Sequence, residues 1–328
     1  MHRFGRSLRS GVTTSRPGYG REVRLLSPLR LLAATGLIAA ATACGSGTPS
    51  TAAPTVTSAT AATTSAPAAA HPVDKVIVFM VENHSLAQMQ AGMPRTYAFA
   101  RRHSYATDYS AIQHPSLPNY IAIAAGSTLG ISDDADPSAH RLTGNNVFRQ
   151  ARKHHRTART YADAMPRRCA LTNAGTYAVR HNPWTYFTPD RAACRRNDVP
   201  ATRLARDAAA GALPHLGFVI PDVIHDAHDG TLAQADAWIS QQIATLTAGP
   251  DWRSGRLAIV VTADEDDHSA GNKVLTVVAT KGQHRRVVTT PLDHYSLTGF
   301  LEDVIGARHL RHARTAPSLA KAFGIDVG

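Results

Sequence analysis

Cysteine is scarce in this chain, and the few cysteines are far apart. Three occur among 328 residues, at positions 44, 169 and 194. They form no pair of closely spaced thiols of the kind that holds structural zinc, so a zinc site built from these cysteines is poorly supported. The sequence also lacks an apolar run of the ~20 residues that a helix needs to cross a bilayer. A membrane-spanning helix is therefore not expected.

Acidic residues are also few, with 24 against 35 basic ones and a formal net charge of +11. Much of the excess lies at the start of the chain, where residues 1–30 hold seven arginines and a single acid, Glu22. The remaining basic residues are scattered among acids, and no basic stripe interleaved with aromatic residues appears. Nucleic-acid binding is therefore not favoured, in spite of the overall charge.

The arginine-rich start leads into an apolar stretch from Leu31 to Ala43. Its length is about the 7–15 residues of a signal-peptide core, so we predict a signal peptide over residues 1–43 and export of the mature protein. Small residues precede Cys44 and Gly-Ser follows it, which resembles a bacterial lipobox and would make Cys44 the lipidated N-terminus of a cell-surface lipoprotein. Ala41 stands where such motifs usually carry Leu, so ordinary cleavage and free secretion are the alternative.

Export has a consequence for the other two cysteines. Oxidising compartments preserve disulfides, and Cys44 would be consumed by lipid, so we expect Cys169 to pair with Cys194. Two free thiols are the alternative. Residues 44–72 are rich in Ala, Thr, Ser and Pro, which predicts a flexible tether. No second linker and no internal repeat follows, so we expect residues 73–328 to form one catalytic domain.

Apolar strand signals alternate with helical patterns along this domain. Because strands and helices take turns along the chain, we predict an α/β fold with a doubly wound, mostly parallel sheet flanked by helices. The strands are expected at residues 75–81, 159–162, 215–220, 257–262 and 273–279, and the helices at residues 120–125, 145–155, 232–247 and 294–305.

Polar side chains follow three of these strands where each strand ends. They lie in Glu82–Ser85, Asp222–Asp229 and Asp264–Asp267. Open α/β sheets bind ligands at the carboxyl edge, and crowded carboxylates repel one another, so the pattern indicates one or two divalent cations. Oxygen ligands suit Mg²⁺, Ca²⁺ or Mn²⁺, whereas added histidines admit zinc or iron, so the identity of the metal does not follow. For the four acids at 264–267 alone, a solvated acidic turn is the alternative.

Ser116 lies in a turn just before a predicted helix, with Pro118 in the first turn. Backbone N–H groups and the positive end of the helix dipole would point at anything bound to its hydroxyl, which favours phosphate. A metal on that hydroxyl would lower its pKa and make it a nucleophile at neutral pH. An ordinary helix N-cap is the alternative for Ser116.

Six motifs occur in an order that carries a family resemblance. They are Glu82-Asn83-His84-Ser85, His114-Pro115-Ser116-Leu117-Pro118-Asn119-Tyr120, Tyr177-Ala178-Val179-Arg180-His181-Asn182-Pro183-Trp184, Asp226-Ala227-His228-Asp229, Asp264-Glu265-Asp266-Asp267 and His294-Tyr295-Ser296-Leu297. Together they resemble the phosphoesterase family of bacterial phospholipases C and secreted acid phosphatases, a branch of the alkaline phosphatase superfamily. The resemblance covers residues 74–305.

The resemblance implies roles for residues of these motifs. It makes Ser116 a nucleophile that forms a phosphoserine intermediate and also contacts the metal. Metal ligands would be Glu82, Asn83, Ser116, Asp226, Asp264 and Glu265. His181, His228 and His294 would be catalytic, and Asn119 and His181 would contact the substrate phosphate. The division of roles among Asp226 and the three histidines stays open.

The chain departs from the family pattern at several places. His84, Leu86, Asp222 and Ala263 stand where the family tends to have other residues, which we expect to adjust the pocket without removing it. Lys273 falls where relatives often have histidine, which puts any family role for that histidine in doubt.

The leading hypothesis is an exported, metal-dependent phosphomonoesterase of the acid-phosphatase type, acting on a phosphate-ester substrate. A phospholipase C acting on phospholipid head groups is the alternative, and a non-catalytic metal-binding surface lipoprotein is less favoured. We expect no nucleic-acid partner, and a membrane contact only through a lipid anchor at Cys44. The sequence gives no prediction of oligomeric state.

Overall fold

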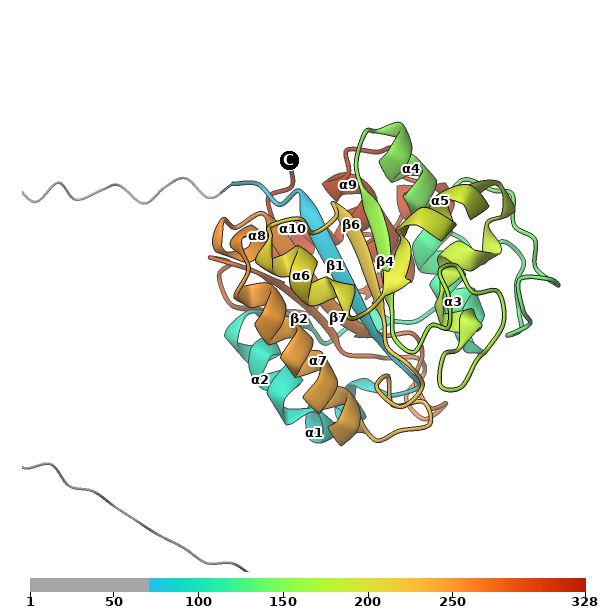
Figure 1. Cartoon of the computed structure of the whole chain (residues 1–328). Helices are drawn as coiled ribbons and strands as arrows, with labels where there is room; N and C mark the ends of the chain where they lie inside the picture. Colours follow the sequence, from blue (N-terminus) through green and yellow to red (C-terminus); the bar gives the residue numbers. More distant parts are fainter. Residues whose placement is uncertain (1–70) are drawn as a thin grey trace, which may run out of the picture. The chain divides into compact units, whose positions relative to one another are not determined.

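One eight-stranded sheet runs through residues 71–328, the part of the chain that the computed structural model describes (Figure 1). The predicted signal peptide and nearly all of the predicted tether lie outside the described residues. The strand order is β5-β4-β6-β1-β7-β8-β2-β9. The strands are β1 (Lys75–Val81), β2 (Ser104–Ala106), β4 (Ala158–Ala162), β5 (Asp198–Pro200), β6 (Leu216–Ile220), β7 (Leu257–Ala263), β8 (Thr276–Thr280) and β9 (Arg286–Val288).

The three central strands are parallel and wholly buried. β1 pairs with β6 on one side and with β7 on the other, and every residue of the three strands is buried. Their apolar runs suit strands covered on both faces, as parallel strands are. Beyond β7 the direction changes, because β8 pairs antiparallel with both β7 and β2. The prediction of a mostly parallel sheet is confirmed.

Helices cover both faces of the sheet (Figure 1). On one face α7 (Leu232–Thr247) packs against its neighbours α1 (Leu86–Gly92), α2 (Pro94–Arg102), α6 (Arg203–Ala209) and α8 (Pro250–Arg253). On the other face α9 (His294–Val304) packs against α3 (Ser116–Ala125), α4 (Val147–Lys153) and α10 (Leu319–Phe323). A two-stranded sheet of β3 (Tyr109–Ser110) and β10 (Leu292–Asp293) adjoins the start of α9.

Two helices show how closely pattern and structure agree. The bounds of α7 are those predicted, because Thr231 begins the helix with a capping box and the apolar residues follow a helical period. The helix predicted at residues 120–125 begins earlier, at Ser116, and all ten residues of α3 are buried. Ser116 is therefore the first residue of a helix in the core, and Pro115 occupies the N-cap position.

The strand predicted at residues 273–279 also has different bounds. β8 begins at Thr276, because Lys273 and Val274 bond instead to the strand segment around Tyr109 and Ser110. Apolar composition alone does not reveal this change of partner.

The segment between β4 and β5 is an irregular excursion, as predicted. It contains η1 (Val179–His181), η2 (Pro183–Tyr186), η3 (Thr188–Asp190) and α5 (Arg191–Asn197). The predicted disulfide between Cys169 and Cys194 is present and joins the ends of the excursion, with the two Cα atoms 5.5 Å apart. Within residues 71–328, no helix has both the length and the apolar character needed to span a membrane.

Candidate active site

The three polar strand ends meet at one edge of the sheet, because β6, β1 and β7 are neighbours. Backbone hydrogen bonds fix the meeting point. The Glu82 N–H donates to the Asp226 carbonyl at 2.8 Å, and the Asp264 N–H donates to the Val81 carbonyl at 3.0 Å. The sheet register therefore places Glu82, Asp226 and Asp264 beside one another, as the strand-end pattern predicts.

Ser116, the first residue of α3, lies beside Glu82, the residue that follows β1. Its hydroxyl donates to Oε2 of the buried Glu82 at 3.0 Å and also adjoins the carboxyl group of Asp264. The Tyr120 hydroxyl, one turn further along α3, donates to the other Glu82 oxygen. The start of the buried helix thus presents a serine hydroxyl to two carboxyl groups from separate strands.

His181 lies between two of the acids. Its Nε2 is 3.3 Å from Glu82 Oε2, and its Nδ1 is 3.1 Å from Asp226 Oδ2. The ring stacks on Tyr120 at 5.3 Å between centroids, with planes 10° apart. Burial lowers the pKa of His181 to about 3, so the imidazole is neutral at physiological pH.

The acids of the site hold protons more tightly than ordinary carboxyl groups. Burial is the first cause in every case. The pKa of Glu82 is raised well above its usual range by burial and then by Asp264 and Asp226. Burial raises the pKa of Asp226 to about 7, and burial with Asp264 raises that of Glu265 to about 9. Such a cluster requires a proton or a cation to offset its repulsion.

Several buried oxygens at this edge have no hydrogen-bond partner within the described residues. They are Asn83 Oδ1, Asp226 Oδ2 and Asp264 Oδ2. The contacts of His181 with the acids are not directed as hydrogen bonds either. Because buried polar groups in proteins are normally paired, such oxygens are suited to ligate an ion.

Glu82, His181 and Asp226 offer ligand atoms that all lie within 4.8 Å of one another. Asn83, with a left-handed backbone at φ 53°, donates its N–H to Asp264 Oδ1 at 3.3 Å. This mixed set of carboxylate, amide and imidazole atoms fits a divalent cation.

The four acids that follow β7 differ in their surroundings. Asp264 faces the site, whereas Asp266 is buried and accepts N–H groups of His268, Ala270 and Asn272 that close its own loop. Asp267 is exposed and accepts from Gln88. This stretch is therefore not a uniformly solvated acidic turn.

Asn119, predicted to contact phosphate, already has partners in the protein. Its Oδ1 accepts the backbone N–H groups of Ile112 and Gln113, at 3.0 and 3.2 Å. Its Nδ2 donates to the Gln113 carbonyl at 2.6 Å and to Glu265 Oε2 at 3.3 Å. The amide shapes the loop that leads into α3 and positions Glu265, and its contact with phosphate stays a prediction.

The two remaining predicted histidines occupy different positions. His294 is fully buried, with Nε2 2.6 Å from the Asp264 carbonyl and Nδ1 3.0 Å from the Tyr109 hydroxyl. Both ring nitrogens are thus engaged behind Asp264, which suits a positioning role. His228 lies at the solvent-facing rim, with its ring centre 6.0 Å from that of His181.

Arg180 is a candidate site residue to which the sequence alone assigned no role. Its Nη2 is 3.0 Å from His228 Nε2, and its Nε is 3.8 Å from Asp134 Oδ2. Asp134 in turn accepts the Leu117 N–H, at the start of α3, at 2.9 Å. A guanidinium group therefore lies beside the helix start that carries Ser116. The only signal was its position next to His181 in a motif.

His114 was likewise without a predicted role. Its Nδ1 is 3.0 Å from Glu265 Oε2, and its Nε2 is 3.2 Å from Asp266 Oδ1. The ring therefore bridges the acids after β7 to the loop before Ser116. The Tyr120 hydroxyl on Glu82 is a third contact that no sequence spacing indicated.

Comparison with known proteins places the chain in a family. The model of the Phosphoesterase family matches residues 90–307. A phosphatidylinositol-3-phosphatase of Mycobacterium tuberculosis is 30% identical over 267 residues, which cover 79% of this chain and 84% of that protein. The chain belongs to the phosphoesterase family. The resemblance inferred from the six motifs is thereby confirmed.

Other relatives agree with this assignment. A phosphate-repressible acid phosphatase of Penicillium chrysogenum is 27% identical over 208 residues, covering 60% of this chain and 50% of that enzyme. A solved protein of the alkaline phosphatase superfamily from Vibrio parahaemolyticus has a TM-score of 0.53 at 11% identity, covering 77% of this chain and 72% of its own. That likeness confirms the predicted fold. As a family member with phosphatase relatives, the protein is a hydrolase of phosphoric ester bonds.

Proposed function

We propose that the protein is a metal-dependent phosphomonoesterase of the acid-phosphatase type, with Ser116 as its nucleophile. The observation that carries the proposal is the position of Ser116, at the first residue of α3 with its hydroxyl on the buried Glu82. The positive end of the α3 dipole favours an anionic group at that place, where Asp134 already accepts the Leu117 N–H and Pro118 has no N–H. The names of the relatives support a monoester substrate, since three are named as acid or probable acid phosphatases and one as a phosphatidylinositol-3-phosphatase.

In this proposal Glu82, Asn83, Asp226, Asp264 and Glu265 hold one or two divalent cations that Ser116 also contacts. Unpartnered oxygens on Asn83, Asp226 and Asp264 support this ligand set. A bound cation would lower the pKa of the serine hydroxyl and offset the charge of the phosphoryl oxygens. His181, which the structure places between Glu82 and Asp226, belongs to the same set as a ligand or a phosphate contact.

The reaction divides into two displacements at phosphorus. Ser116 Oγ forms the new bond as the ester oxygen leaves, and the hydroxyl proton passes to Glu82 Oε2, its hydrogen-bond acceptor in the structure. In this proposal His228, at the solvent-facing rim, protonates the leaving oxygen. Water then attacks phosphorus from the opposite face and gives a proton to His228, while the bond between phosphorus and Ser116 Oγ breaks and Oγ takes back the proton from Glu82. Arg180 can hold phosphoryl oxygens in both steps, because guanidinium groups match their geometry.

Ser116→Ala tests the nucleophile. Hydrolysis of p-nitrophenyl phosphate should disappear, whereas Ser127→Ala, two residues beyond the end of α3, should leave it unchanged. Mass spectrometry after a rapid acid quench should find phosphate on the Ser116 peptide of the unmodified enzyme. Phosphatase activity that survives Ser116→Ala at the full rate would refute the mechanism. Release of diacylglycerol from phosphatidylcholine, without phosphatase activity, would favour the phospholipase C alternative.

Metal dependence has its own test. Treatment with a chelator should abolish hydrolysis, and adding back single divalent ions should show which of them restore it. Metal analysis of the purified protein before and after chelation gives a readout that does not depend on turnover. Full activity in the metal-free protein would exclude the proposed ligand role.

We also propose export, with residues 1–43 as the signal peptide, 44–72 as the tether and 73–328 as the phosphoesterase domain. The Cys169–Cys194 disulfide supports an oxidising compartment. Incorporation of labelled fatty acid that is lost in Cys44→Ser would support a lipid anchor. Secretion of an unlabelled protein would instead support ordinary cleavage.

A further inference from the structure

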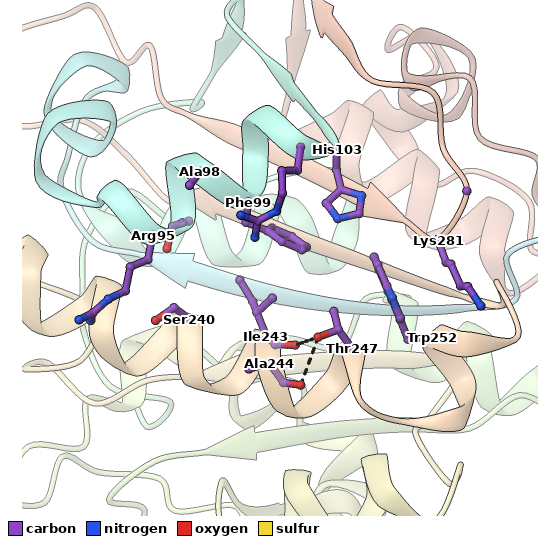
Figure 2. A pocket seen from close by; sticks show the side chains of 13 residues that line it. Arg95, Ala98, Phe99, His103, Ser240, Ile243, Ala244, Thr247, Trp252 and Lys281 are labelled. Atoms are coloured by element: carbon purple, nitrogen blue, oxygen red, sulfur yellow. Dashed lines mark hydrogen bonds between the residues drawn. The ribbon is translucent and has the colours of Figure 1, made fainter.

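A groove of about 560 Å³ lies between α2 and α7, on a helical layer of the fold and outside the candidate active site (Figure 2). Its volume is within the range of pockets that hold small organic ligands. The apolar floor is formed by Phe99, Ile243 and Trp252, all of which are buried. The groove can therefore receive the apolar body of a ligand.

The rim of the groove is basic. Arg95 and Arg102 from α2 and Lys281 from the turn after β8 line it, and all three are exposed. Figure 2 shows Arg95 and Lys281 at opposite ends. No acidic side chain lines the groove, and within residues 71–328 neither arginine has an ion-pair partner. Unneutralised cations around an apolar trough match a ligand that is both anionic and apolar.

Basic and aromatic side chains also lie next to each other on α2 outside the groove. Arg101 lies over the Tyr97 ring at 5.3 Å, and Tyr97 packs edge-on against Tyr105 at 5.6 Å. Strand β9, which pairs with the strand β2 that contains Tyr105, follows directly after Arg285 and exposes Val287. Basic residues mixed with tyrosines and an exposed aliphatic side chain are typical of surfaces that lie on a membrane.

The chain enters the described domain near one end of this groove. Asp74 pairs with Arg256, and the His71 carbonyl lies beside Gly255, three residues after Trp252. The described part of the chain therefore begins near the Trp252 end of the groove.

We propose that the groove between α2 and α7 binds an anionic phospholipid of a membrane, with an acyl chain along Phe99, Ile243 and Trp252. The phosphate group lies at the rim formed by Arg95, Arg102 and Lys281. A soluble acidic peptide or a nucleic acid would satisfy the cations but would leave the apolar floor without a partner. The site is separate from Ser116, and the proposal does not rest on the proposed function.

Vesicle co-sedimentation tests the charged rim. The full chain carrying Cys44→Ser and Ser116→Ala removes the lipid anchor and turnover from the measurement. Vesicles of equal parts phosphatidylglycerol and phosphatidylcholine should bind it, and vesicles of phosphatidylcholine alone should not. Adding Arg95→Gln and Arg102→Gln should weaken binding about tenfold or more.

The matched control removes two other exposed arginines, Arg167→Gln and Arg168→Gln, and should bind as before. Residues 1–30 are identical in every variant, so their arginines cannot cause a difference between the variants. Equal loss in the control and groove variants, or equal binding to both vesicles, would overturn the proposal. So would a polyanionic peptide that binds in the same variant-dependent way while vesicles do not.

Fluorescence tests the apolar floor. Brominated acyl chains quench tryptophan on contact, so vesicles of brominated phosphatidylglycerol should quench part of the emission. That part should disappear in Trp252→Phe and persist in Trp238→Phe. Quenching unchanged by Trp252→Phe would show adsorption without entry into the groove and would refute the proposal. With Ser116 intact, Arg95→Gln and Arg102→Gln should leave hydrolysis of p-nitrophenyl phosphate unchanged, so failure here is distinct from failure of the catalytic proposal.

Discussion

The acid-rich edge of the sheet and the groove between α2 and α7 use charge in opposite ways. At the edge, Glu82, Asp226 and Asp264 are buried, and several of their oxygens lack partners among the described residues. In the groove, Arg95 and Arg102 are exposed to water and have no ion-pair partner among residues 71–328. An unpaired charge is costly when buried and nearly free when hydrated.

This difference shows that the acid-rich edge, and not the groove, is where functional side chains lower the stability of the fold. Backbone hydrogen bonds at the ends of β1 and β7, together with the packing of the buried helix α3, hold these acids beside one another. Such local conflicts are expected at sites that bind something the rest of the fold does not supply. The groove cations need no such enforcement, so their substitution should affect binding and little else.

Asp264→Asn should give the largest effect. Loss of a ligand and of charge beside Ser116 should lower the phosphatase rate on the order of 10³-fold. In the chelated protein the same change removes a buried charge, so the free energy of unfolding should rise by about 1 kcal/mol or more. Thermal unfolding with chelator and p-nitrophenyl phosphate assays measure the two effects.

Asp267→Asn is the matched control, because Asp267 lies in the same stretch but is exposed. It should change neither quantity appreciably. A metal-replete, fully active Asp264→Asn protein would contradict the ligand assignment.

Arg180→Ala should give the next largest effect. Loss of a charged hydrogen-bond donor to phosphate costs about 1.5–3 kcal/mol, which corresponds to about 10–100-fold in kcat/KM. The inhibition constant of inorganic phosphate should rise with it, and Arg180→Lys should recover only part of the loss because lysine lacks the planar fork. An inhibition constant unchanged by Arg180→Ala would show that the guanidinium group does not contact phosphate.

The sequence predicted the parts of this site that depend on strand ends. Apolar runs identified β1, β6 and β7, and the rule for open α/β sheets brought their polar ends together. Ser116 was identifiable because a helix start and a motif coincide there. Asp264 could be separated from Asp267 only by its closeness to the strand, and the structure shows that their surroundings do differ.

The contacts that complete the site could not be predicted. The distances from Arg180 to Asp134 and from His114 to Glu265 depend on loops whose paths no periodicity describes. Nor did the pattern distinguish His294, behind Asp264, from the exposed rim position of His228. The groove was not foreseen either, because α2 is a short helix whose arginines resemble a solvated face.

Removing the disulfide should destabilise the excursion that carries Arg180 and His181. For Cys169→Ser with Cys194→Ser, the free energy of unfolding should fall by about 3 kcal/mol, since the closed loop spans 25 residues. Denaturant titration measures this loss. Arg167→Gln, next to the bridge but exposed, is the control and should have little effect. A double variant of full stability would show that other contacts suffice to hold the excursion.

The pH dependence of stability should reveal the buried acids directly. Unfolded carboxyl groups have pKa values of about 4, whereas those of folded Asp226 and Glu265 are about 7 and about 9. The folded state thus retains protons that the unfolded state has lost, and stability falls as pH rises toward 9. Burial lowers the pKa of His181 to about 3 and that of His294 to about 4, which makes stability rise with pH until about 6.5.

Above pH 6.5 the two histidines no longer change the stability, whereas the carboxyl groups with raised pKa values still do, including Asp198 and Glu302 outside the site at about 7. The melting temperature of the chelated protein should therefore fall between pH 6.5 and 9. Divalent metal should reduce the slope, because it replaces the protons. The double variant Asp226→Asn with Glu265→Gln should reduce the same slope in the chelated protein. A melting temperature that is constant over this range would mean that the acids are neutralised in some other way.

Substitution of a groove arginine should have the smallest effect on stability. Arg102→Gln removes an exposed charge next to Arg101 and Arg95, all on a helix without acids, so the free energy of unfolding should change by less than about 0.5 kcal/mol. Thermal unfolding at low salt measures the change, with Arg168→Gln as the comparison. A destabilisation of several kcal/mol would show that Arg102 has a structural role, and the contrast between costly buried acids and nearly free surface cations would no longer hold. A neutral result would leave binding as the only property that these cations affect.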